Sequence, residues 1–435
     1  MIGRNDMLKR MTTHLLAGAM LLAATGAASA ETLKVWSRQT DESALILKTL
    51  TDAFTAKTGI QVESYNTGTD FEQRLARAAA ARDLPDVVIN DDAALGQMLK
   101  MGIIEEVDPT KIEGNDQIVP AAWNSAKGAN GKVYSVPISA QAFALFVRKD
   151  WREKLGLPQP KTWDDLHKLA EAFTKNDPDG NGKADTFGMS VPASTVRGYA
   201  SWYMSNFIWA AGGNFVKQEK GGFKPDLESK PVADALGFMR SLFCEGLVQP
   251  GAINATTGDA LPTFRSGQTG IFLSGPYHIA VLDEQPGKDK IEVLPPPAGP
   301  GGVAALAEGT SAYIMTGTKA RTAAEKFIAY LISPEGQEIG MGEGTGHTPL
   351  VRLPINKTVD VDAVRKDPRW GTFKEVFDKS GHYVPPVPNW TPIRMLTAEG
   401  FNKILASCNS DIPAELKSID QEMAAELRKQ KALAE

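Results

Sequence analysis

Strand-like and helix-like patterns of hydrophobic positions alternate along the chain from residue 32 onward. Segments 32–37 and 60–65 are strand-like, and segment 42–58 between them carries Leu47, Leu50 and Phe54 at helical spacing. A helix over 70–82, a short apolar strand over 86–90 and a helix over 93–101 follow. This order predicts a mainly parallel sheet covered by helices on both faces.

The later elements carry local start and stop signals. We expect two extended stretches over 133–147, broken at Pro137. A helix should begin at Thr162, with Asp165 in capping-box position, and another should run from Pro231 to Gly246. A helix over 322–332 should stop at Pro334, and a final helix should cover 414–429. The proline- and glycine-rich segment 294–302 is predicted to be a connection.

Residues 1–30 have the pattern of an export signal. A basic start is followed by the apolar run 15–24 and the small-residue site Ala28-Ser29-Ala30. A membrane anchor is the alternative, but the run is about half of the roughly 20 apolar residues that a span needs. We therefore expect cleavage near Ala30, and the absence of a cysteine at that site predicts a periplasmic protein without a lipid tether.

Composition and charge narrow the class of protein. The 435 residues are 42% hydrophobic and 23% charged, which is typical of a globular chain large enough for two lobes. Without residues 1–30, 44 basic residues face 51 acidic ones, a net charge of −7 that disfavours a nucleic-acid partner. Cys244 and Cys408 would both reach an oxidising compartment, so a disulfide and two separate thiols both stay open.

Several short motifs, in their order and spacing, carry a family resemblance. They are LKVW at 33–36, FTAKTGI at 54–60, LPDVV at 84–88, GKVYSVP at 131–137, KTWDDL at 161–166, FRSG at 264–267 and SGPY at 274–277. Together they resemble the extracellular solute-binding proteins of carbohydrate ABC transporters, the group that includes maltose-binding protein. The resemblance covers essentially the whole chain after residue 30.

The resemblance implies a fold of two discontinuous α/β lobes joined by a three-segment hinge. Each lobe would contain a mainly parallel sheet flanked by helices, and the crossings are placed near Ala142, Glu292 and Leu350. The expected domains are a signal peptide over 1–30, an N-terminal lobe over 31–142 plus 293–349, and a C-terminal lobe over 143–292 plus 350–435.

Polar residues at the ends of the predicted strands are the first candidates for the ligand site, because ligands of open α/β sheets bind beyond the carboxyl ends of the strands. The candidates are Ser37, Arg38, Gln39, Asp41, Asp91, Asp92 and Gln141. Their carboxylates, amides and hydroxyls can form hydrogen bonds with sugar hydroxyls. The alternative is a structural role in turns and helix caps. Gln141 is similar in position to a cleft carboxylate of maltose-binding protein, which disfavours maltose itself.

Aromatic side chains supply a second group of candidates. The segment 200–213 is rich in aromatic residues, and flat sugar faces stack on such rings. By resemblance, Trp202, Tyr203 and Tyr277 face the ligand, while Phe207 and Trp209 are core. The alternative is that any of these rings is simply core.

The resemblance adds a last group of candidates from the second half of the chain: Gly309, Thr310, Trp390 and Arg394. Trp390 and Arg394 lie in the segment that closes the cleft, and Arg394 has the better match there. Its planar guanidinium suits a carboxylate, phosphate or sulfonate, whereas a surface ion pair is the alternative.

One segment matches the first nine positions of a calcium-binding loop. Asp177, Asp179, Asn181, Lys183 and Asp185 would supply its oxygen atoms, Lys183 through its carbonyl group. The twelfth position is Gly188 where a bidentate glutamate is expected, which favours the alternative of a plain turn over a weak calcium site. We expect no required cofactor, with calcium as the one candidate.

These features predict a non-enzymatic, monomeric protein that captures a sugar or sugar derivative and delivers it to the membrane permease of an ABC importer. The four histidines after residue 30 have no metal-ligand spacing, and no nucleophile elbow or phosphate loop is present. A periplasmic carbohydrate-active hydrolase is the alternative enzyme class, since many carboxylates are available. A binder of a non-sugar polar or anionic solute is the other alternative.

Overall fold

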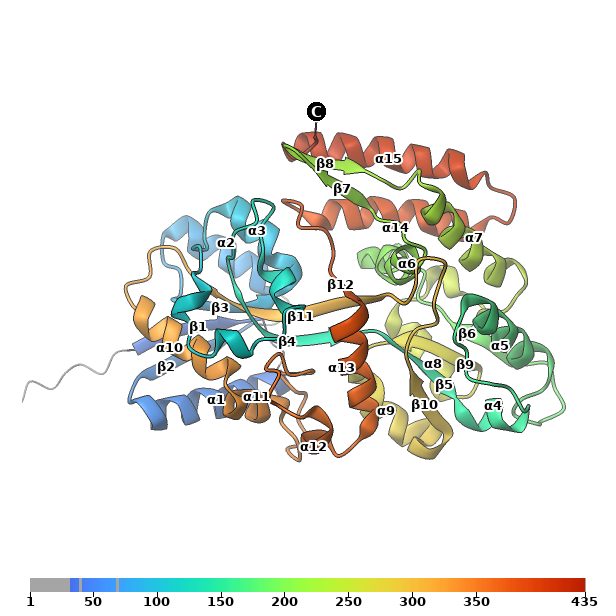
Figure 1. Cartoon of the computed structure of the whole chain (residues 1–435), viewed down its shortest axis with the longest axis horizontal. Coiled ribbons are helices and arrows are strands. Elements are labelled where there is room, and N and C mark those ends of the chain that lie inside the picture. The colour runs from blue at the N-terminus through green and yellow to red at the C-terminus, as the bar shows by residue number, and fades with distance from the viewer. Residues whose placement is uncertain (1–31, 39–40, 68–69, 435) are drawn as a thin grey trace, which may run out of the picture.

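The computed structural model describes residues 32–38, 41–67 and 70–434, without the side chains of residues 41 and 42. The predicted signal peptide and Gln39 lie outside these residues. A six-stranded sheet forms the core of what we call the first lobe (Figure 1). Its strands are β1 (Thr32–Ser37), β2 (Gln61–Asn66), β3 (Val87–Asp91), β4 (Val136–Ala142), β11 (Ala305–Ile314) and β12 (Gly381–His382).

Helices cover both faces of this sheet, as the alternating pattern predicts. They are α1 (Asp41–Thr58), α2 (Phe71–Ala81), α3 (Leu95–Met101), α10 (Arg321–Ile332) and α11 (Pro334–Met341). Figure 1 shows α2 and α3 on one side and α1, α10 and α11 on the other. Leu47, Leu50 and Phe54 of α1 are buried, and Phe54 packs edge-on against Phe327 of α10.

A four-stranded sheet forms the core of the second lobe, in the order β10 (Ile291–Leu294), β5 (Ala144–Arg148), β9 (Thr269–Ser274) and β6 (Phe187–Ser190). The expectation of a mainly parallel sheet is wrong here. Only β6 and β9 are parallel, whereas β5 pairs antiparallel with both β9 and β10. The reason is the connection: β5 enters directly from the other sheet instead of through a helical crossover.

The second lobe is rich in helices, and it carries a hairpin of β7 (Val216–Glu219) and β8 (Gly222–Pro225). Its helices are α4 (Lys149–Lys154), α5 (Trp163–Lys175), α6 (Tyr199–Ala210), α7 (Lys230–Cys244), α8 (Thr257–Arg265), α9 (Ile279–Leu282), α14 (Trp390–Ala406) and α15 (Ile412–Lys429). The capping box of Thr162 and Asp165 at the start of α5 is confirmed. The aromatic segment forms the buried helix α6, which packs on α7 and α14.

The first link between the two sheets is a single residue, Phe143, which joins β4 to β5. The break predicted at Pro137 is therefore wrong, since Pro137 lies inside β4 opposite Ser311. β4 tolerates the proline because β11 is its one strand neighbour among the described residues, and a register shift of that pair lies at Ser311. A second link, the predicted connection after β10, leads into β11.

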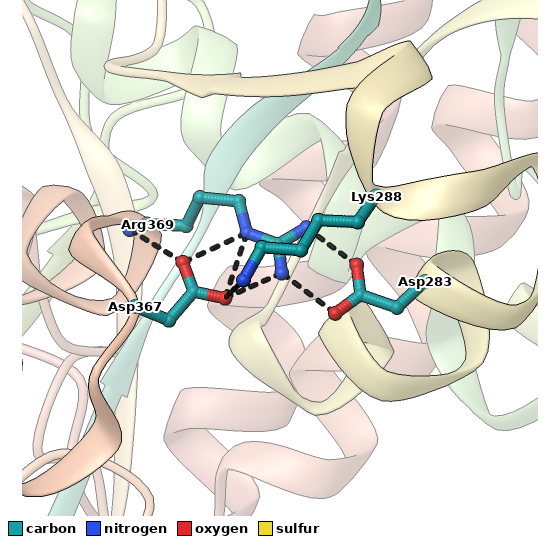
Figure 2. A network of polar contacts seen from close by, with 4 residues as sticks. All are labelled: Asp283, Lys288, Asp367 and Arg369. Carbon is teal, nitrogen blue, oxygen red and sulfur yellow. Dashed lines mark hydrogen bonds and ion pairs between the residues drawn. The ribbon is translucent and has the colours of Figure 1, made fainter.

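Helix α13 (Pro368–Ser380) lies between the two lobes (Figure 1) and contacts β4 and β11 as well as β5 and β10. The short helix α12 (Val361–Arg365) precedes it. An ion network around the buried pair of Arg369 and Asp367 fixes the start of α13 (Figure 2): Arg369 binds Asp283 through both terminal nitrogens at 2.6 and 2.7 Å and also binds Asp367. Lys288 contacts the same Asp367 carboxylate at 3.3 Å.

Cys244 at the end of α7 forms a disulfide with Cys408, just after α14. This resolves the alternatives that the sequence leaves open. The two cysteines are 164 residues apart in the sequence, so the bond restricts the unfolded chain and favours the folded one. Within the described part of the chain, no helix is long and apolar enough to cross a membrane.

Candidate ligand-binding site

A cavity of about 600 Å³ lies where the carboxyl ends of β3 and β4 and the first half of β11 meet α6 and α14 of the second lobe. This volume is in the range of small-molecule sites. Its walls combine residues of β3, β4 and β11 with Trp202 and Ser205 of α6 and with segments 348–352 and 383–390. The site is therefore assembled from parts of the sequence that are far apart.

The structure brings nine of the sequence-predicted ligand residues together in the lining of this cavity. They are Arg38, Asp91, Asp92, Gln141, Trp202, Gly309, Thr310, Trp390 and Arg394. Trp390 and Arg394 are four residues apart on α14 and so share one face of the helix. The family resemblance favours Arg394 over Trp390 at this position, whereas both residues line the cavity.

Three predicted residues do not line the cavity. Ser37 is fully buried in β1. Tyr203 is 1% exposed and packs against Phe207 in the core, because neighbouring helical residues point about 100° apart and Trp202 already faces the cavity. Tyr277 is covered by Arg352, whose guanidinium lies 5.3 Å from the ring centroid. Of the remaining candidates, the Gln39 residue and the Asp41 side chain are not among those described.

Glu308, in the middle of β11, is a cavity residue that the sequence analysis missed. One carboxylate oxygen accepts a hydrogen bond from Trp202 Nε1 at 2.8 Å, and the other accepts one from Gln141 Nε2 at 2.9 Å. Gln141 in turn accepts a hydrogen bond from Arg352, which was also missed. A chain of polar contacts thus fixes the Trp202 ring and the Gln141 amide in the cavity wall.

Arg38 and Asp91 form an ion pair at the edge of the cavity. The guanidinium lies 2.5 Å from the Asp91 carboxylate and 3.2 Å from Glu72 at the start of α2. Arg38 directly follows β1 and Asp91 ends β3, and these two strands are parallel neighbours, which explains why residues so distant in sequence meet.

Asp92 is a buried carboxylate of the cavity wall. Ser311 donates to one oxygen at 2.6 Å, while the other oxygen, Oδ2, is buried without a hydrogen-bond partner among the described residues. Burial raises the pKa of Asp92 to about 7, against the hydrogen bond of Ser311 and the nearby Ser125 hydroxyl and with the charges of Asp91 and Glu308. The carboxyl group therefore changes its charge near neutral pH.

We expect Asp92→Asn to stabilise the protein more as the pH rises. The pKa of Asp92 is raised on folding, so the carboxyl ionises in the unfolded chain before it does in the folded one, and the parent protein loses stability as the pH rises from 5 to the folded pKa of about 7, whereas asparagine stays neutral. One pKa unit corresponds to about 1.4 kcal/mol, so the difference in the free energy of unfolding should grow by roughly 2 kcal/mol over this range. Urea unfolding of both proteins at each pH measures it; a constant difference would contradict the buried carboxyl.

The predicted calcium loop lies outside the cavity lining. The Asp177 carboxylate accepts hydrogen bonds from the backbone N–H groups of Gly180, Asn181 and Gly182, and the Asn181 amide donates to Asp179 and Asp185. The described residues contain no group of three histidine, cysteine, aspartate or glutamate side chains that would hold a metal ion. Since carbonyl and amide oxygens also bind calcium, the loop stays a prediction.

Comparisons with known proteins identify the family of the chain. Residues 38–338 match the family described as bacterial extracellular solute-binding protein. The polygalacturonan/rhamnogalacturonan-binding protein YtcQ of Bacillus subtilis is 29% identical over 46% of the chain and 41% of its own length. The fructooligosaccharide ABC transporter substrate-binding protein FusA of Streptococcus pneumoniae is 26% identical over 57% of the chain and 49% of its own length. The chain thus spans less than half the length of these relatives.

A solved structure shows the same fold over nearly the whole chain. The sugar-binding protein MalE from the phytopathogen Xanthomonas citri superposes with a TM-score of 0.78 at 21% identity, covering 92% of this chain and 98% of that one. The two-lobed arrangement that the motifs imply is therefore confirmed.

Proposed function

Because the chain belongs to the bacterial extracellular solute-binding protein family, we propose that it binds a saccharide in the cavity between its lobes and delivers it to the permease of an ABC importer. One observation carries the saccharide assignment: the Trp202 ring lines a cavity whose other walls present Gln141, Asp92 and Thr310. An aromatic face beside fixed donors and acceptors is what a sugar ring requires. The names of YtcQ and FusA support the same ligand class.

The proposal extends to location and assembly. The family is extracellular, and the signal-like residues 1–30 support export to the periplasm with cleavage near Ala30. We propose that the mature chain acts as a monomer that contacts permease subunits through both lobes. We propose that it binds its ligand and catalyses no reaction.

A thermal-shift screen over neutral sugars, sugar acids and oligosaccharides tests the ligand class. A ligand that binds only the folded protein raises the melting temperature, by an amount that follows its concentration over the dissociation constant. Recovery of the ligand after incubation should return it intact, whereas shorter products would indicate a hydrolase. Stabilisation by non-sugar solutes alone would contradict the proposal.

We expect the lobes to close on the ligand, as periplasmic binding proteins do by hinge motion. The one-residue link at Phe143 and the strand β11, which pairs with β4, provide narrow connections for this motion. Small-angle scattering should therefore give a smaller radius of gyration with saturating ligand than without it. An equal radius, with binding shown by calorimetry in the same sample, would count against closure.

A further inference from the structure

More basic than acidic side chains line the cavity. The basic residues are Arg38, Lys100, Lys127, Arg352 and Arg394, and the acidic ones are Asp91, Asp92 and Glu308. Arg38 and Asp91 neutralise each other at 2.5 Å. Four cations then face two carboxyl groups, and one of these, Asp92, changes its charge near neutral pH. A cavity with this balance favours an anionic ligand.

Arg394 is the most informative of these cations, because it is partly buried without an ion-pair partner. Its hydrogen bond goes to the carbonyl oxygen of Gly198 at 3.4 Å, and no carboxylate oxygen of the described residues lies within 4.0 Å of it. Burial lowers the pKa of Arg394, and the nearby charge of Arg197 acts in the same direction, against that of Glu308. A partly desolvated guanidinium of this kind gains free energy when an anion joins it.

Arg352 is likewise without an ion pair in the described part of the chain. Its guanidinium donates to the side-chain oxygen of Gln141 and lies over the ring of Tyr277. Glu308 forms no ion pair with Arg352 within 4.0 Å, and the hydrogen bonds of its two carboxylate oxygens come from Trp202 and Gln141. Two guanidinium groups in the cavity lining therefore lack a carboxylate partner.

We propose that the ligand is an acidic saccharide that contains a uronic acid, and that Arg394 and Arg352 bind its carboxylate while Trp202 contacts a sugar face. This inference rests on the proposed function and narrows its ligand class. The planar fork of arginine matches a carboxylate through two parallel hydrogen bonds. A neutral sugar would leave both guanidinium groups uncompensated in the closed cavity.

Calorimetric titration with matched sugars tests the inference. The probes are galacturonate and glucuronate with their short oligomers, each beside the neutral sugar that carries a hydroxymethyl group in place of the carboxylate. Citrate serves as a non-sugar carboxylate, and a sulfated galactose as a second anion. We expect uronates to bind at least about tenfold more tightly than their neutral counterparts, with a preference that falls as salt rises.

Variants identify the residues. Arg394→Gln and Arg352→Gln should each weaken uronate binding about tenfold to a hundredfold and change neutral-sugar binding little. Arg77→Gln, at an exposed position on α2, is the matched control and should change neither. Melting curves without ligand verify that each variant is folded. If one arginine variant does not fold, the other still tests the inference.

Each outcome has a distinct meaning. Neutral sugars that bind as tightly as uronates, or a sulfated sugar that binds more tightly, would overturn the inference and leave the proposed function standing. Binding of uronates that neither arginine variant weakens would overturn the assignment of these residues. Binding of citrate without any saccharide, or no binding of any probe, would contradict the proposed function as well.

Discussion

Replacing Arg369 by alanine should lower the free energy of unfolding by about 3 to 5 kcal/mol, because it leaves the Asp283 carboxylate without its cation and the buried Asp367 carboxylate with Lys288 alone. Arg369 and Asp367 are 9% and 8% exposed, and Arg369 contacts Asp283 with both terminal nitrogens (Figure 2). Burial alone would raise the pKa of Asp367, but the hydrogen bonds and charge of Arg369 outweigh it and hold that pKa at about 2. Urea unfolding at neutral pH measures the loss.

The same helix provides the matched control. Lys379 and Glu375 of α13 form an exposed pair at 2.6 Å, so Lys379→Ala should change the free energy of unfolding by less than about 0.5 kcal/mol. A loss below about 1 kcal/mol for Arg369→Ala would show that the network does not anchor α13. Because α13 contacts both sheets, we also expect the variant to alter the scattering change on ligand addition.

Replacing Trp202 by alanine should weaken saccharide binding about tenfold to a hundredfold, by analogy with the 1 to 3 kcal/mol that an aromatic platform contributes to base stacking. The ring lines the cavity and is held edge-on by Phe143 at 4.6 Å. Its removal also takes away the N–H group that binds Glu308. Calorimetric titration with the tightest saccharide of the screen measures the change.

Trp209→Ala and Trp202→Phe are the two controls. Trp209 is a core residue of the same helix, stacked on His382 at 5.4 Å, so its truncation should cost about 3 to 5 kcal/mol of stability and little affinity. Trp202→Phe keeps a ring and loses the N–H group, so it should retain more affinity than alanine. Unchanged affinity with a large loss of stability in Trp202→Ala would place Trp202 in the core.

Strand periodicity and the strand-end rule predicted most of the first lobe and one wall of the site. Arg38, Asp91 and Asp92 directly follow or end apolar runs, and parallel strands bring such residues to one edge of the sheet. The second sheet was harder to predict. Only Phe143 separates β4 from β5, and no local sequence pattern indicates that β5 pairs antiparallel with β9 and β10. The motifs supplied the two-lobed arrangement that periodicity did not.

Glu308 and Arg352 were missed for different physical reasons. Strand β11 was not predicted, and Glu308 is the one charged residue between Val303 and Met315, which is a signal that was present in the sequence. Arg352 lies in a segment without regular structure. An isolated β-bridge between Leu353 and Ala140 holds this segment beside β4. Tertiary pairing of this kind leaves no local pattern to read.

A crystal structure of the protein with the tightest saccharide of the screen shows directly whether the cavity is the saccharide site. We expect an intact saccharide in the cavity, with a sugar face on Trp202, hydrogen bonds to Gln141, and a closer approach of the two lobes than in the free protein. A saccharide bound outside this cavity, or a cleaved product within it, would contradict the account.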